Sequence, residues 1–255
     1  MIILKSPKEI EKIALSCRIV AKTLDYLKDM VKPGITTREI ERFAENYIRS
    51  NNAVPAFKGY KGYPASICAS VNNEVIHGIP SNRVLEEGDI LGVDLGVYKE
   101  GFYGDAACTF PVGKIHPHVE RLLRVTEEAL YIGIENAKMD NRISDISCSI
   151  QSHVEVNGFS VVRAFVGHGI GRDLHEEPQI PNFGIPGRGP KLREGMTLAI
   201  EPMVNEGGYE VMILEDGWTA VTMDGKLSAH FEHTILVTSD KPKILTKINE
   251  KDYII

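Results

Sequence analysis

The sequence reads EGDILGVD at residues 87–94 and EGMTLAIE at residues 194–201. Each stretch opens with a Glu-Gly turn, continues through an apolar run and ends on a carboxylate. The two stretches are separated by an offset of 107 residues, and VPAFKG at 54–59 resembles VRAFVG at 162–167 at an offset of 108. Because the offsets agree, they predict an internal duplication. The alternative is a chance similarity between turn-then-strand segments.

The order of predicted elements repeats in the same way. Ser6 and Pro7 are typical of a helix start, and Thr36 with Glu39 forms a capping box for a second helix. Strands and turns follow to about residue 112. A helix is then expected over residues 117–138, and another begins at Ser144 and ends near a C′ glycine, Gly158.

This pattern predicts an α+β protein with outer helices around central antiparallel strands. We expect a single domain, residues 1–255, made of helix–helix–strand halves at about 1–112 and 113–255. Such halves would be related by a pseudo-two-fold axis, which would bring the carboxylates that end the two repeated strands to one central site.

Composition excludes several classes of protein. The chain has 255 residues, 43% of them apolar and 25% charged, with a net charge of −6. It has no long basic run, so nucleic-acid binding is not expected. Its four cysteines form no CxxC pair, which fits a reducing compartment. No apolar run approaches the roughly 20 residues of a membrane span, and we expect a soluble, cytoplasmic protein.

Two aspartates lie in neighbouring strand-like runs. Asp94 lies in the apolar run 90–97, Asp105 follows in 104–107, and residues 98–101 resemble a turn. A hairpin would bring the two carboxylates close together, and a divalent cation between them would remove their repulsion. For Asp94 alone, a buried carboxylate bonded to backbone amides is an equally good interpretation.

Three further candidates extend this set of possible ligands. Glu201 and Glu232 adjoin strand-like runs, and His168 lies in GHGIG at 167–171, where glycines could let the backbone pass close to a ligand. The five donors are rich in oxygen and lack a thiolate, and they exceed what one tetrahedral zinc needs. They therefore predict two bridged divalent ions. An HExxH zinc protease is excluded because HEEP at 175–178 lacks the second histidine, and phosphate-loop and GxSxG motifs are absent.

Two other histidines are candidates for catalysis. His77 lies in VIHGIP at 75–80, and His175 follows the glycine-rich segment. A lone histidine is more often structural than catalytic, so the residues themselves favour a role for His175 more than one for His77.

Six short motifs together carry a specific resemblance. They are VDLG at 93–96, YGDAA at 103–107, GHGIG at 167–171, LHEEP at 174–178, IEP at 200–202 and FEHT at 231–234. From about residue 6 to residue 245, the chain resembles bacterial-type members of the type I methionine aminopeptidases, within the pita-bread metallopeptidases.

The resemblance implies a duplicated pita-bread fold and a hydrolase with two divalent metal ions. The metal ligands would be Asp94, Asp105, His168, Glu201 and Glu232, with Asp105 and Glu232 bridging. Cobalt, manganese, iron and zinc all accept such ligands, so the physiological metal is left open. A metal-bridged water or hydroxide would attack the first peptide carbonyl, releasing the N-terminal methionine of nascent proteins whose second residue is small.

The resemblance also implies roles for individual side chains. Glu201 would accept and shuttle the proton, His175 would stabilise the developing oxygen, and His77 would position the scissile amide. The substrate-binding residues would be Phe57, Tyr60, Tyr63, Cys68, His77, Leu174, His175 and Trp218.

Three positions depart from many relatives, which carry Phe, Cys and His where this chain has Leu174, Phe57 and Lys61. These departures concern the pocket lining and leave its fine preference open. The resemblance further implies a cytoplasmic monomer, without the zinc-finger extension of eukaryotic type I members or the insertion of type II members. Docking on ribosomes is left open.

Two rival functions use the same scaffold. An Xaa-Pro peptidase would usually carry a sizeable N-terminal domain, which this sequence does not show. A non-catalytic binding protein would be expected to have lost metal ligands, whereas all five positions here hold competent ones.

Overall fold

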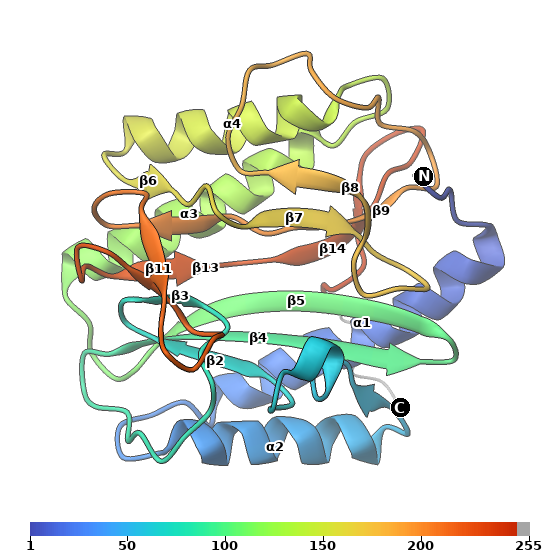
Figure 1. The fold of residues 1–255 in the computed structure, drawn as a ribbon. Helices are drawn as coiled ribbons and strands as arrows, with labels where there is room; N and C mark the ends of the chain where they lie inside the picture. Colours follow the sequence, from blue (N-terminus) through green and yellow to red (C-terminus); the bar gives the residue numbers. More distant parts are fainter. Residues whose placement is uncertain (249–255) are drawn as a thin grey trace.

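Four helices enclose two antiparallel sheets in the computed structural model of the chain, which describes residues 1–248 (Figure 1). Helices α1 (Pro7–Lys28) and α2 (Thr37–Ser50) cover one sheet, and α3 (Pro117–Asn136) and α4 (Ile143–Val156) cover the other. The expected α+β architecture with outer helices and central antiparallel strands is confirmed.

The first two helices begin where their local sequence requires. At α1, the backbone N–H and the hydroxyl of Ser6 both donate to Glu9 Oε2, at 2.8 and 2.7 Å. At α2, the Thr36 N–H donates to Glu39 Oε2 at 2.9 Å, and Thr36 Oγ1 accepts from the Glu39 N–H at 3.2 Å. The bonds run both ways at α2 and only towards Glu9 at α1, and in both helices they satisfy backbone N–H groups at the helix start.

The second pair of helices follows the same order with one difference. Helix α4 begins at Ile143, one residue before the predicted Ser144, because the Asp145 carboxylate accepts the Arg142 N–H at 2.7 Å. An acid at the third helical position thus sets the start without a capping side chain at Arg142. Gly158 follows the C-cap with φ +78°, as expected for a C′ residue.

The sheet of the first half is built around one long hairpin. Its strands are β1 (Val54–Pro55), β2 (Cys68–Val71), β4 (Ile90–Lys99) and β5 (Phe102–Pro111). Strand β4 pairs with the other three, and β4 and β5 meet at a turn in which Glu100 and Gly101 both have positive φ. The predicted hairpin is therefore confirmed. A 3-10 turn, η1 (Tyr60–Gly62), lies between β1 and β2.

The sheet of the second half has five strands in the order β15-β14-β9-β7-β8. These are β7 (Val166–Gly169), β8 (Glu176–Pro181), β9 (Thr197–Ile200), β14 (His233–Leu236) and β15 (Lys243–Ile244). Antiparallel β9 and β14 correspond to the long hairpin of the first half. Two smaller three-stranded sheets comprise β3 (Glu74–Ile76), β6 (Ser160–Val161), β10 (Met203–Asn205), β11 (Val211–Ile213), β12 (Ala220–Thr222) and β13 (Ser228–His230).

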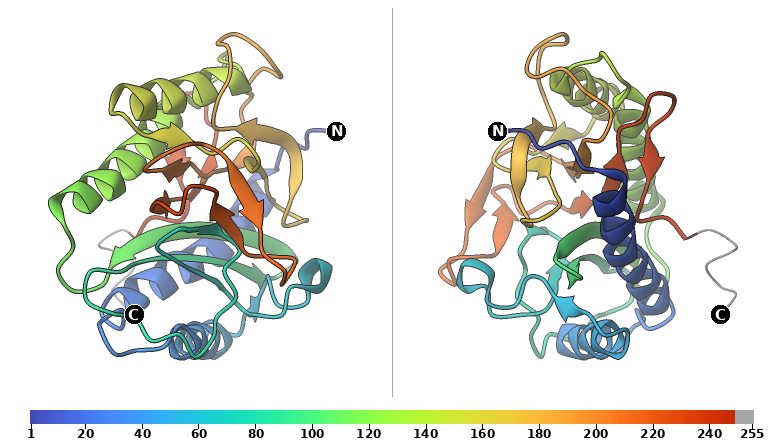
Figure 2. Two further views of the ribbon diagram at one scale, coloured as in Figure 1. Left: turned by 60° about the vertical axis from the view of Figure 1, so that its left-hand side comes forward. Right: turned by 90° about the vertical axis from the view of Figure 1, so that its right-hand side faces the viewer.

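Each half has its own apolar core. One core packs α1 and α2 against β4 and β5, and the other packs α3 and α4 against β9 and β14. Figure 2 shows the two helical layers on opposite sides of the strands. The partly buried Cys108 packs against both cores. Within residues 1–248, no helix combines the length and apolarity that crossing a bilayer requires.

Buried polar bonds join the halves at the centre. The Thr234 hydroxyl donates to the Asp105 carbonyl at 2.7 Å and lies 3.2 Å from the Asp105 N–H, from which it accepts. The Thr109 hydroxyl makes a matching pair of bonds with the backbone of His230, at 2.8 and 2.9 Å. The strands that carry the candidate ligands are thereby held in a fixed relation across the pseudo-two-fold axis.

Candidate metal centre

A cavity of about 280 Å³ lies between the two sheets. It is lined by every residue that the sequence singled out for the site, from both halves of the chain. These residues are Phe57, Tyr60, Tyr63, Cys68, His77, Asp94, Asp105, His168, Leu174, His175, Glu201, Trp218 and Glu232. The fold thus brings together groups that lie up to 175 positions apart in sequence.

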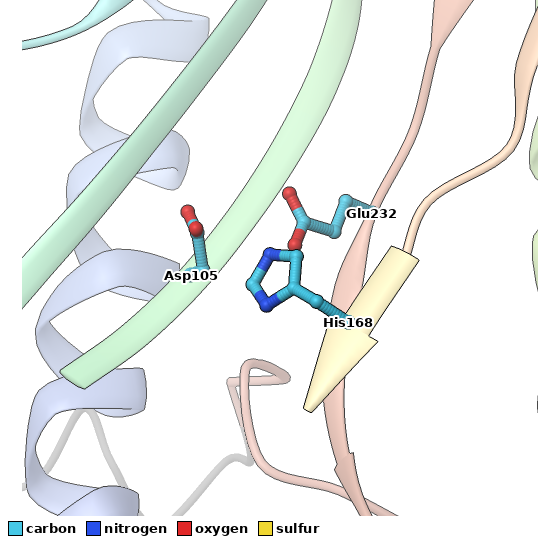
Figure 3. Close-up of side chains that lie close together, drawn as sticks. All are labelled: Asp105, His168 and Glu232. Carbon is cyan, nitrogen blue, oxygen red and sulfur yellow. The ribbon is translucent and has the colours of Figure 1, made fainter. Parts of the chain in front are cut away.

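Three of the predicted ligands converge most closely. One donor atom each of Asp105, His168 and Glu232 lies within 4.8 Å of the other two, and all three residues are buried. Figure 3 shows their side chains meeting between the central strands, Asp105 from β5, His168 from β7 and Glu232 from the segment that precedes β14. Two carboxylates and an imidazole at such separations form a suitable set for a divalent cation.

Asp94 and Glu201 complete the acidic lining. In the β4–β5 register, Asp94 pairs with Ala107 and Gly96 pairs with Asp105, so the two aspartates are diagonal neighbours on one face of the hairpin. Glu201 follows β9, and its Oε1 lies 3.4 Å from His168 Nε2. The backbone carbonyl of Glu201 accepts a bond from the buried Asn182 amide at 3.0 Å, which fixes the chain at this point.

Several buried carboxylate oxygens have no protein partner in residues 1–248. They are Asp94 Oδ1, Asp105 Oδ1 and Glu232 Oε1. Burying an oxygen of this kind without a hydrogen bond is costly, and coordination to a cation removes that cost. The donor set and its unpartnered oxygens therefore fit divalent metal ions.

The electrostatics of the carboxylates lead to the same conclusion. Burial raises the pKa of Asp94 to about 7, although the hydrogen bond that it shares with Asp105 acts in the opposite direction. Burial and then the charge of Asp94 raise the pKa of Asp105 well above its usual range, and they do the same for Glu201. For Glu232, burial and then the charge of Asp105 raise the pKa. Without a cation, the cavity favours protonated carboxyl groups, so bound metal would have to release these protons.

One backbone contact prepares His168 as a ligand. Its Nδ1 lies 2.9 Å from the Gly169 carbonyl oxygen, which can only accept, so Nδ1 carries the proton. Burial lowers the pKa of His168 to about 4, and the ring is neutral at physiological pH. Its Nε2 lone pair is thereby free to face the carboxylates, as a metal ligand requires.

His175 lies at the mouth of the cavity, beside the ligands. Its Nδ1 is 2.9 Å from the Tyr60 hydroxyl, the two rings stack at 5.3 Å, and the His168 ring centre is 4.3 Å away. Desolvation by the surrounding protein, and then the neighbouring His168, lower the pKa of His175 to about 3. When Tyr60 donates to Nδ1, the neutral imidazole carries its proton on Nε2 and can donate there.

Several aromatic and apolar side chains line the other end of the cavity. The Tyr63 ring meets Trp218 edge-on at 5.1 Å, and Cys68, Phe57 and Leu174 are buried around them. Burial raises the pKa of the Cys68 thiol, so this sulfur remains protonated. The result is an apolar pocket beside the acidic cluster that suits an unbranched, polarisable side chain.

Phe165 lines the same cavity and was not singled out from the sequence. Its ring lies edge-on to His77, with centroids 5.6 Å apart. His77 itself has a left-handed backbone, with φ +62°. The duplication did contain a signal for Phe165, because it occupies the same position in the 162–167 repeat as Phe57 does in 54–59.

Two glycines beside His168 lie where the protein leaves no room for a Cβ. A Cβ at Gly169 would lie 2.3 Å from the Glu177 carbonyl oxygen, and one at Gly171 would lie 2.2 Å from Lys5 Cε. The expectation that these glycines also let the backbone pass close to a ligand stays a prediction. Glycine is needed here for close packing between segments.

Comparisons with known proteins agree with this geometry. The profile of Metallopeptidase family M24 matches residues 11–239. The methionine aminopeptidase of Clostridium perfringens (strain 13 / Type A) is 57% identical over 248 residues, covering 97% of this chain and 100% of the relative. Methionine aminopeptidase 1 of Bacillus subtilis (strain 168) is 53% identical, with coverage of 97% and 100%.

Solved structures give the same result for the fold. The methionine aminopeptidase of Thermotoga maritima superposes with a TM-score of 0.96 at 50% identity, covering 97% of this chain and 100% of that structure. The prolidase of Pyrococcus furiosus gives a TM-score of 0.80 at 24% identity, covering 97% of this chain and 66% of that one, and shares the fold alone.

Proposed function

The chain belongs to metallopeptidase family M24, and we propose that it is a metal-dependent aminopeptidase that removes the N-terminal methionine of nascent polypeptides. One observation carries this proposal above the others. Five buried donors, three of them with an oxygen that has no partner within residues 1–248, line the same cavity as a group of aromatic and apolar side chains.

We infer two divalent cations in this cavity, held by Asp94, Asp105, His168, Glu201 and Glu232. Four carboxylates and one imidazole exceed the needs of a single ion, and Asp105 and Glu232 would be shared between the two. When bound, the cations would act as Lewis acids that polarise the scissile carbonyl and lower the pKa of water. Cobalt, manganese, iron and zinc are all compatible, and titration should show two equivalents per chain.

The protein groups around the ions would manage the proton and the developing charge. Glu201 would accept the proton of the attacking water and pass it to the departing amine. The proton on His175 Nε2 would be donated to the carbonyl oxygen as negative charge develops there. His77, half-buried between Phe165 and Trp218, would hold the scissile amide in place.

The rest of the cavity would select the substrate. Phe57, Tyr60, Tyr63, Cys68, Leu174 and Trp218 would surround the methionine side chain. Because Phe165 packs on His77, it would meet the side chain of the second residue and restrict its size. Comparing release from Met-Ala-Ser and Met-Leu-Ser tests this restriction. Equal rates would contradict it.

Location and assembly are part of the same proposal. The four unpaired cysteines suit a reducing cytoplasm, in which a monomer would meet nascent chains, with or without docking on ribosomes. Sedimentation of the purified protein measures its assembly state directly.

The deciding experiment is methionine release from Met-Ala-Ser by protein stripped with EDTA and then supplied separately with Mn²⁺, Fe²⁺, Co²⁺ or Zn²⁺. Restored release supports the proposal and ranks the metals. Folded protein that cleaves an Xaa-Pro dipeptide but releases no methionine would instead indicate a prolidase. Folded protein that retains no divalent metal would indicate a binding protein on the same scaffold.

A further inference from the structure

The connection between β7 and β8 carries two side chains of the candidate site. Leu174 is buried in the wall of the apolar pocket, and His175 lies beside His168. This connection lies outside the ladder, because β7 ends at Gly169 and β8 begins at Glu176, and these two residues form the last pair. Its conformation must therefore be held by contacts from elsewhere.

A buried ion pair is one of these contacts. Lys5 Nζ lies 2.6 Å from Glu176 Oε2, and these side chains are only 2% and 5% exposed. The other oxygen of Glu176 accepts the backbone N–H groups of Arg172 and Asp173, at 2.7 and 3.3 Å. The Glu176 carboxylate therefore binds the backbone of the connection between β7 and β8 and also links this connection to Lys5 in the N-terminal segment.

The N-terminal segment is itself anchored. The Lys5 N–H donates to the Gly195 carbonyl at 2.8 Å, and the Gly195 N–H donates to Val237 at 3.0 Å. In Figure 1, the N-terminal segment reaches the end of the second sheet beside the β7–β8 connection. The backbone of Lys5 is thus fixed to Gly195, and its side chain binds Glu176, which is 171 residues away in sequence.

Gly171 makes room for this arrangement. A Cβ at this position would lie 2.2 Å from Lys5 Cε and 2.9 Å from Glu176 Oε1. The last glycine of the GHGIG motif is therefore required by the lysine side chain. A second contact runs in parallel, because the Arg172 guanidinium bonds Glu9 Oε1 at 2.9 Å and lies over the Phe102 ring at 5.0 Å.

A buried ion pair is a weak means of gaining stability, because the desolvation of both charges offsets their attraction. Its position suggests a different purpose. We propose that Lys5 and Glu176 are positioning residues that hold His175 at the distance from the scissile carbonyl that catalysis needs. The proposal rests on the proposed function, and neither residue is itself a catalytic residue.

The expected effect follows from the geometry. Displacing an oriented catalytic group by about 1 Å can lower the rate by roughly 100-fold. We expect the double variant Lys5→Met/Glu176→Gln, which leaves no unpaired buried charge, to lose about 10- to 100-fold in kcat. KM should change less, and calorimetric metal affinity should match wild type, because none of the five proposed ligands is touched.

A double-mutant cycle separates positioning from a general structural role. In a His175→Ala background, removing the Lys5–Glu176 pair should cost little further kcat, because the group that it positions is already absent. If the two losses multiply, or if Lys5→Met/Glu176→Gln retains wild-type kcat, the proposal is overturned. Arg49→Met, which breaks an exposed pair with Glu45 on α2, is the matched control and should leave kcat unchanged.

Gly171→Ala gives an independent route if the double variant fails to fold. It would displace the Lys5 side chain without removing either charge, and the same cycle with His175→Ala should again be non-additive. A wild-type chain that releases no methionine with any of the four metals would overturn both proposals. Active wild type with an additive cycle would overturn the positioning role alone.

Discussion

At the scale of single residues, the site contains buried carboxyl groups that should lower the stability of the folded protein when no ligand is bound. Asp94, Asp105 and Glu232 each bury an oxygen that has no partner in the described part of the chain, residues 1–248. Burial also raises the pKa of each of these carboxyl groups, so the cavity disfavours its own charge. Buried carboxyl groups with a strongly raised pKa are common at sites that bind a ligand or a metal, so they indicate a functional site.

Glu201→Gln tests the proton-transfer role. The amide keeps the size of the side chain but cannot accept a proton, so kcat should fall by roughly 100- to 10,000-fold. In metal-free protein the melting temperature should not fall, because one of several buried acidic groups that disfavour one another's charge is removed. Methionine release from Met-Ala-Ser, with bound metal measured in parallel, provides the readout. Wild-type kcat in this variant would rule out the role, and Glu194→Gln, at the exposed start of the same repeat, is the control.

Trp218→Ala tests the apolar pocket. The indole meets Tyr63 at 5.1 Å and His77 at 6.3 Å, so its loss should weaken contact with the methionine side chain and loosen His77. We expect the ratio of kcat/KM for Met-Ala-Ser over Leu-Ala-Ser to fall about 10-fold, with some general loss of activity. Tyr26→Ala, which removes an aromatic pair on the outer helices, should leave that ratio unchanged.

At the scale of elements, local chemistry was enough to predict where most helices begin. Ser6 with Glu9 and Thr36 with Glu39 are pairs only three residues apart, so the sequence alone shows that these bonds can form. The start of α4 was less accurate because Arg142 is an unusual cap. The support from Lys5 to Glu176 was not predicted, because it depends on how two distant segments pack.

Glu45 on α2 gives a prediction about acid stability. Burial raises its pKa, but hydrogen bonds from Ser66, Arg49 and Lys58 outweigh this and lower the pKa to about 2. A carboxyl group whose pKa is lower in the folded state stabilises that state above its unfolded pKa. This contribution is lost as pH falls from about 4.5 towards about 2.

Glu45→Gln should therefore lower the melting temperature by about 2–4 °C near neutral pH, as expected for about 1 kcal/mol of lost hydrogen bonding. The difference from wild type should shrink as the pH is lowered through this window. Calorimetry of both proteins across the window measures it, with Glu135→Gln, an exposed acid on α3, as the control. A difference that is constant with pH would show that the charge of Glu45 is not responsible.

At the scale of the whole molecule, the repeat in the sequence anticipated the architecture. The matched stretches at 87–94 and 194–201 fall at the start of equivalent strands, β4 and β9, and end on Asp94 and Glu201. The order of the smaller sheets could not be anticipated, because β12 pairs with β3 across most of the chain. The assignment of residues 1–255 to a single domain, with halves at about 1–112 and 113–255, stays a prediction.

The position of the carboxylates between the halves couples metal binding to the stability of the whole molecule. Ligands from both halves meet there, and Thr234 of one half holds the backbone of Asp105 in the other. Metal at about 100 times its Kd should raise the melting temperature over EDTA-treated protein by roughly 5–10 °C.

Asp105→Asn should abolish most of this rise. Near pH 8 the metal-free variant should melt above metal-free wild type, because asparagine has no charged form for burial and Asp94 to disfavour on folding. Calorimetry with and without Mn²⁺ measures both effects, and Glu135→Gln should keep the full response. A metal-free Asp105→Asn protein less stable than metal-free wild type would show that the aspartate stabilises the centre even without a cation.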